Sequence, residues 1–170
     1  MKGRKTMGNI LSNDIRKQYY KTFENVRKII EAFPKDKWLV PHGDEYYIPS
    51  RIAYHSVEFI DGLLVGGFKD PELFFSKLPF GSWYEGTAET LPSQEALLGY
   101  YDEVFGRAKT LLEALDDEAL AAPLEVDRPH IGTCQMGLHM YMMRELAAHT
   151  GELNKMMIEN GLDDIWVSRE

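Results

Sequence analysis

The sequence feature that most constrains the fold is the segment 138–157, LHMYMMRELAAHTGELNKMM, which is long enough for a helix of roughly five turns. Two side chains that can ionise, Glu145 and His149, stand within its apolar stripe. Positions four apart differ by roughly 40° around a helix axis, so both side chains project from one face. Met142 and Leu153 continue that face on either side. Because burying an unpaired charge is costly, the two side chains must be paired, hydrated or bound to a ligand.

Apolar residues recur at spacings of three and four in three further segments, as in amphipathic helices. The four expected helices cover 12–33, 49–66, 93–115 and 133–160. Ser12 or Asn13 is expected to cap the first helix and Thr133 the fourth. Gly66 and Gly67 end the second helix, and Gly161 stops the fourth in a left-handed conformation.

These segments predict an all-α protein, because strand-like alternation is not sustained anywhere and no internal repeat is present. The expected architecture is an antiparallel four-helix bundle with a long crossover between the second and third helices. That crossover, 67–92, includes a short helix starting at Pro71, and the loop 121–133 has room for a brief extended pair. With 170 residues and 44% hydrophobic content, the chain is expected to form a single domain over 1–170, with residues 1–9 frayed.

Charge and cysteine content narrow the function classes. A formal net charge of -8 argues against nucleic acid or an anionic membrane as the main partner, because both require a basic face. Cys134 is the only cysteine, which rules out an intramolecular disulfide and a cysteine-rich zinc site. Neither a secretory signal nor an apolar run of membrane-spanning length is recognisable. We therefore expect a cytoplasmic protein.

A metal site is the chemistry that the inward stripes suggest. His55 lies on the stripe of the second expected helix, facing the same core as Glu145 and His149 of the fourth. Helix bundles assemble metal sites from such residues on facing helices. Two imidazoles and one carboxylate leave coordination positions for water or substrate. The competing interpretation is a set of hydrogen-bonded core histidines and an ordinary surface pair on one helix.

The remaining candidates carry weaker signals. His42 and His130 lie in loops, where a solvated side chain is the ordinary outcome. His139 is roughly 80° from His149 around the helix, so it can line the edge of the site but not its centre. Cys134 is interpreted as a buried inert thiol. The fourth helix is rich in methionine, which indicates core filling or a soft lining for an apolar pocket.

Together these residues resemble the DinB/YfiT-like superfamily of metal-binding four-helix bundles. The resemblance rests on His55 in IAYHSVEFIDGLL, on His149 followed by Thr150-Gly151-Glu152, and on a helix count and length that fit the whole chain. It implies a divalent metal, zinc or nickel above all, in an open site at one end of a homodimeric bundle. The chain departs from the family pattern at Glu145, where relatives have a histidine, so iron and manganese also remain open.

The resemblance implies a metal-dependent enzyme that acts on a small-molecule substrate. The reaction would be transfer of a low-molecular-weight thiol, or a related isomerisation or hydrolysis, with the metal activating a thiol or water. Side chains expected around the ligands comprise the acids Glu58, Asp61 and Glu152, the donors Tyr54 and Tyr141, and His139 at the edge. Trp38 and Trp83 suit either the pocket mouth or a dimer contact. The alternative is a non-catalytic helical binding protein with a degenerate, metal-free site.

Overall fold

The computed structural model describes residues 9–64, 71–124 and 130–167, and these parts of the chain form six helices and no strand. Two isolated β-bridges, His42 with Asp44 and Pro123 with Cys134, are their only extended pairings. The helices are α1 Ile10–Ala32, α2 Pro49–Leu64, α3 Pro71–Ser76, α4 Gln94–Ala114, α5 Asp117–Ala121 and α6 Gln135–Glu159. The all-helical prediction is therefore confirmed for these residues, and the short helix expected at Pro71 is present.

The start of α1 differs from the prediction. The helix begins at Ile10, so Ser12 and Asn13 lie inside it, and Asn9 occupies the cap position without a side-chain hydrogen bond. The capping carboxylate comes instead from Asp117 of α5, which accepts from the backbone N–H of Leu11 at 3.3 Å and of Ser12 at 2.8 Å. A residue more than a hundred positions away satisfies the free donors, so no local cap was needed.

The start of α6 also differs, because Cys134 rather than Thr133 occupies the cap position, and it makes no side-chain cap hydrogen bond. The Thr133 carbonyl instead accepts from Leu124 N–H at 3.1 Å, which draws residue 133 into the bridged loop. At the other end, Gly161 has φ +79°, the left-handed stop that the sequence predicted. The expected stop of α2 at Gly66 and Gly67, and the fraying of residues 1–8, lie outside the described residues.

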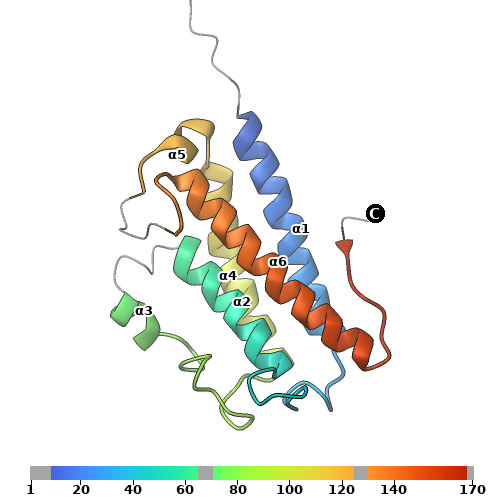
Figure 1. The fold of residues 1–170 in the computed structure, drawn as a ribbon. Helices are drawn as coiled ribbons and strands as arrows, with labels where there is room; N and C mark the ends of the chain where they lie inside the picture. Colours follow the sequence, from blue (N-terminus) through green and yellow to red (C-terminus); the bar gives the residue numbers. More distant parts are fainter. Residues whose placement is uncertain (1–8, 65–70, 125–129, 168–170) are drawn as a thin grey trace, which may run out of the picture.

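Four long helices surround one core, and neighbouring pairs differ in direction (Figure 1). The pairs α2–α6 and α1–α4 run antiparallel, whereas α2–α4 and α1–α6 run parallel. The α1–α4 direction follows from contacts at both ends, with Arg16 near Leu112 at one end and Ile30 near Gln94 at the other. The long segment between α2 and α4 returns the chain to the end where α2 began. The expected antiparallel order thus holds for two of the four neighbouring pairs.

Side chains from all four long helices fill the core. Those without exposed surface include Tyr19, Val26, Ile29, Ile52, Tyr54, Leu97, Met142, Leu146 and Leu153. Trp38 is also buried and donates its indole N–H to the Pro92 carbonyl at 2.9 Å. This bond ties the loop after α1 to the start of α4, and it places Trp38 in the interior rather than at a pocket mouth.

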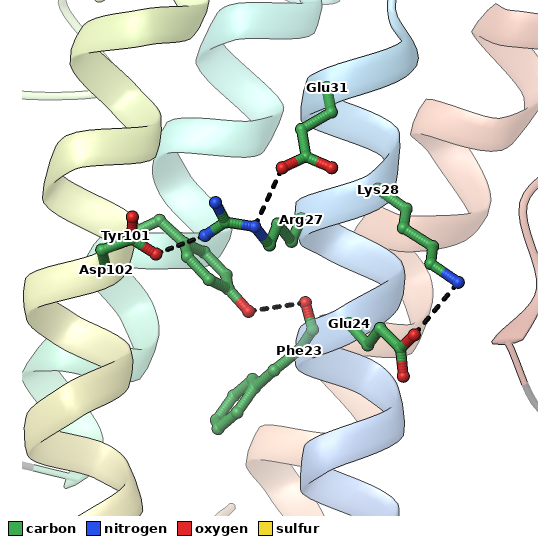
Figure 2. A network of polar contacts seen from close by, with 7 residues as sticks. All are labelled: Phe23, Glu24, Arg27, Lys28, Glu31, Tyr101 and Asp102. Carbon is green, nitrogen blue, oxygen red and sulfur yellow. Dashed lines mark hydrogen bonds and ion pairs between the residues drawn. The ribbon is translucent and has the colours of Figure 1, made fainter.

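Polar contacts fix α1 against α4 on the outside of this core (Figure 2). Arg27 of α1 pairs with Glu31 on its own helix and with Asp102 of α4, and its guanidinium lies 5.5 Å from the ring centre of Tyr101. The Tyr101 hydroxyl donates to the Phe23 carbonyl at 2.7 Å. In the parts of the chain that the structure describes, no helix is long and apolar enough to cross a membrane.

Candidate functional site

His55 and His149 meet across the antiparallel α2–α6 pair. Their ring centres are 4.9 Å apart with an interplanar angle of 74°. The two side chains are 14% and 13% exposed, so both are mostly buried. Each histidine sits on the apolar stripe that its helix turns toward the core. The packing of the two stripes is what brings together residues 94 positions apart in the sequence.

Each of these histidines has a carboxylate one turn further along its own helix. His149 Nδ1 lies 2.8 Å from Glu152 Oε2, and His55 Nδ1 lies 3.4 Å from Glu58 Oε2. An ionised carboxylate can only accept, so Nδ1–H is the donor and the lone pair is assigned to Nε2. Glu58 is 5% exposed, and the bond from His55, although long, is the polar contact that the described residues give it. Such a carboxylate–histidine arrangement orients metal-binding imidazoles in many proteins.

Glu145 is close to the pair along α6, but its carboxylate faces elsewhere in the structure. Its Oε1 lies 3.1 Å from Arg144 Nη2, and the side chain is 28% exposed. The Arg144 guanidinium also lies 4.9 Å from the ring centre of Tyr141. Within the described residues, no three His, Cys, Asp or Glu side chains are arranged to hold a metal ion. The structure therefore brings together two of the three expected ligands, His55 and His149.

Aromatic rings pack against His55 of this pair. Trp83 stacks on His55 with ring centres 3.8 Å apart and planes 25° apart, and Phe59 lies 5.7 Å from the same imidazole. Phe59 in turn contacts Tyr141, with ring centres 5.7 Å apart. Trp83 belongs to the irregular segment before α4, which has no periodicity that could predict its direction. The sequence analysis placed Trp83 either at the pocket mouth or in a dimer contact, and in the structure its ring stacks on the His55 imidazole.

Two other residues expected near the ligands have partners elsewhere. The Tyr54 hydroxyl donates to the Gly81 carbonyl at 2.8 Å, and burial raises the pKa of this phenol. Asp61 accepts from the Tyr100 hydroxyl at 2.8 Å and pairs with Arg107 at 2.8 Å, so it faces α4. Because Asp61 is six residues beyond His55, it is about 9 Å further along α2.

His139 also lies away from the pair, about 15 Å along α6 from His149. Its ring is 5.6 Å from that of Tyr19 of α1, and its Nδ1 lies 3.0 Å from the Tyr19 hydroxyl. Burial lowers the pKa of His139 to about 4, so this imidazole is neutral at pH 7.

Of the two loop histidines, His130 is exposed, as the sequence predicted, whereas His42 is partly exposed and is paired with a carboxylate. His42 contacts the Glu159 carboxylate, and this hydrogen bond lowers the pKa of Glu159. The His130 ring lies 5.6 Å from that of Tyr141. Cys134, at the start of α6, is a free cysteine and is partly exposed rather than buried as the sequence analysis expected.

The sequence matches no known protein-family model and no curated protein. Membership of the DinB/YfiT-like superfamily therefore stays a prediction that rests on the residues themselves.

Proposed function

We propose that the chain is a DinB/YfiT-like four-helix bundle in which His55 and His149 form the centre of a divalent-metal site, and that it is an enzyme acting on a small molecule. The observation that carries this proposal is the pairing of the two imidazoles at 4.9 Å, each with its Nδ1 turned to a carboxylate. Core histidines that serve packing alone need neither a second imidazole nor two orienting carboxylates.

The protein's own groups would act as follows. Glu58 and Glu152 hold the Nδ1 protons and so present the Nε2 lone pairs for coordination. Glu145 supplies the third ligand once its carboxylate separates from Arg144. The Arg144 side chain is exposed and can turn to solvent. Zinc or nickel suits two imidazoles and a carboxylate, and iron and manganese accept the same set. A divalent ion held there would lower the pKa of a bound thiol or water and make it a nucleophile.

The surroundings favour a compact, partly apolar substrate. Trp83 covers one face of His55, while Phe59 and Tyr141 continue the aromatic wall toward the start of α6. Excluding water from this wall would strengthen the interaction between the site and a developing charge. We propose transfer of a low-molecular-weight thiol to an electrophile as the reaction, with hydrolysis or isomerisation as variants that use the same residues.

Metal content tests the site. Chelator-free protein, and protein reconstituted with zinc, nickel, iron or manganese, is analysed by plasma mass spectrometry beside His149→Ala and the control His42→Ala. We expect about one ion per chain in the wild type and the control, and loss in His149→Ala. Equal occupancy in all three proteins would contradict the assignment. Thiol transfer to an aryl halide and ester hydrolysis are then assayed with the ion that binds.

Arg144→Gln provides a second, independent test of the ligand set. Removing the guanidinium frees the Glu145 carboxylate, so this variant should bind the metal more tightly than the wild type, whereas Glu145→Gln should bind it more weakly. If neither substitution changes the affinity, Glu145 is not a ligand. Light scattering on the same samples tests the expected homodimer.

Two observations favour a different function. The pairing of Glu145 with Arg144 and the lack of a three-residue ligand group among the described residues suit a metal-free helical protein that binds a partner or an apolar ligand. This alternative predicts no stoichiometric metal under any of the reconstitution conditions above.

A further inference from the structure

The methionines of α6 divide into two sets that core packing alone does not explain. Met142, Met156 and Met157 are buried among the core side chains. Met136, Met140 and Met143 line an open pocket beside the first turns of α1, and Met143 also packs against the edge of the core. Met140 is 66% exposed, although a methionine that fills the core would be covered.

The pocket methionines share one face of α6 with His139, which lines the same pocket. Positions 136, 139, 140 and 143 are three or four residues apart, so their side chains fall within an arc of roughly 100° over two turns. Three thioether sulfurs and one imidazole therefore border a single pocket. The one carboxylate that also lines it, Asp14, is paired with Lys17 at 3.5 Å.

His139 is oriented for a ligand on its pocket side. The Tyr19 hydroxyl lies 3.0 Å from His139 Nδ1 and 3.3 Å from the His139 carbonyl oxygen. The hydroxyl also lies 3.4 Å from Met142 Sδ, so the carbonyl and this sulfur both offer an acceptor for its one hydrogen, and we assign Nδ1–H as the donor to the hydroxyl oxygen. The lone pair then lies on Nε2, which has no hydrogen-bond partner among the described residues. With 6% of its surface exposed, His139 is a nearly buried polar side chain at the wall of the pocket.

We propose that Met136, Met140, Met143 and the Nε2 atom of His139 form a binding site for copper(I). Thioether sulfur is a soft ligand that selects Cu(I), and imidazole completes such a set, whereas zinc, nickel and other divalent ions prefer nitrogen, oxygen and thiolate ligands. The site is separate from the His55–His149 pair, since it lies between α6 and α1 and not between α6 and α2. It needs no redox step, because the ion binds as Cu(I).

The test is anaerobic titration of the full chain with Cu(I) against a chromophoric Cu(I) chelator, repeated with Ag(I), which does not change oxidation state. We expect one ion per chain. Loss of an orienting partner weakens metal sites by 10–100-fold, so loss of a direct ligand in Met140→Leu should weaken binding by about tenfold or more. Met157→Leu, buried at the far end of the same helix, is the matched control and should bind as the wild type does.

Methyl resonances locate the ion independently of affinity. In protein labelled at the methionine methyl carbons, Ag(I) should shift the signals of Met136, Met140 and Met143 and leave those of Met156 and Met157 in place. Tyr19→Phe, which removes the partner of His139 Nδ1, should reduce affinity without changing the number of ions bound.

Three results would overturn the proposal. The first is equal binding by Met140→Leu, Met143→Leu and the wild type. The second is loss of binding in Cys134→Ser, which would place the ion on the nearby thiol. The third is loss of binding in His149→Ala with the methionine variants unaffected, which would place it at the other histidine pair. Because Met140 is exposed, its replacement leaves the fold intact, and circular dichroism verifies this.

Discussion

Asp61→Asn separates the two roles that the sequence and the structure give to this carboxylate. The sequence placed Asp61 near the metal ligands, whereas in the structure its two oxygens accept from Tyr100 and from Arg107, each at 2.8 Å. Asparagine has the same shape but offers one oxygen and one NH₂ group. Arg107 can only donate and therefore keeps the oxygen, so the Tyr100 hydroxyl is left with the NH₂ group and loses its charged acceptor. We expect Asp61→Asn to destabilise the fold and to leave metal affinity unchanged.

The magnitude follows from burial. The Asp61 side chain is 12% exposed and the Arg107 side chain 44%, so the tyrosine bond is shielded and the ion pair is partly screened by solvent. A hydrogen bond to a charged group contributes about 1.5–3 kcal/mol, and the exposed pair adds less than about 1 kcal/mol. The expected loss is about 2 kcal/mol in the free energy of unfolding. For a domain of this length, that loss lowers the Tm by about 4–8 °C.

Urea denaturation followed by circular dichroism measures the change, with Asp102→Asn as the control. Asp102 pairs with Arg27 on the surface and is 60% exposed, so its replacement should alter stability by less than about 1 kcal/mol. A double-mutant cycle with Tyr100→Phe isolates the buried bond. If Asp61→Asn keeps wild-type stability but weakens metal binding, Asp61 serves an imidazole and the reasoning from the structure is refuted.

Three further predictions test the packing around the site. Arg16→Gln should lower the free energy of unfolding, measured in urea, by about 1–2 kcal/mol, because the Arg16 guanidinium donates to carbonyls at the end of α4. Lys17→Gln removes an exposed ion pair and should leave the free energy of unfolding unchanged. Gly137→Ala would put Cβ 2.7 Å from a backbone carbonyl oxygen and should lower the free energy of unfolding by about 1–3 kcal/mol. Gly151→Ala on the same helix meets nothing within 4 Å and should raise it by about 0.5–1 kcal/mol. Equal shifts in Tm for the two variants would contradict the close contact at Gly137. Since burial lowers the pKa of His139 from 6.5 to about 4, the unfolded chain takes up this proton first as pH falls, and stability is lost below pH 6.5. In metal-free protein, His139→Asn should therefore reduce the fall in unfolding free energy between pH 6.5 and about 4.5 by roughly 2 kcal/mol, and an unchanged fall would show that His139 is not buried neutral.

The sequence by itself determined where the helices lie and which faces they bury. Spacings of three and four predicted the four long helices to within a few residues, because periodicity records the face that must leave water. The same stripes placed His55 and His149 on inward faces, and packing of α2 on α6 then brought the two rings together. The stop at Gly161 was predictable because few other residues adopt a left-handed conformation without strain.

Tertiary structure alone decided the partners of the polar side chains. Asp117 caps α1 from α5, Asp61 turns to α4, and Trp83 reaches His55 from a segment without periodicity. A local pattern fixes the direction in which a side chain leaves its own helix, but not which element lies opposite it. The partner depends on helix order, and the long crossover made α2 and α4 parallel neighbours. The sequence likewise does not distinguish the methionines of α6 from one another, because their surroundings depend on which helix lies opposite. Only helix packing shows which of them are buried in the core and which line the pocket beside α1.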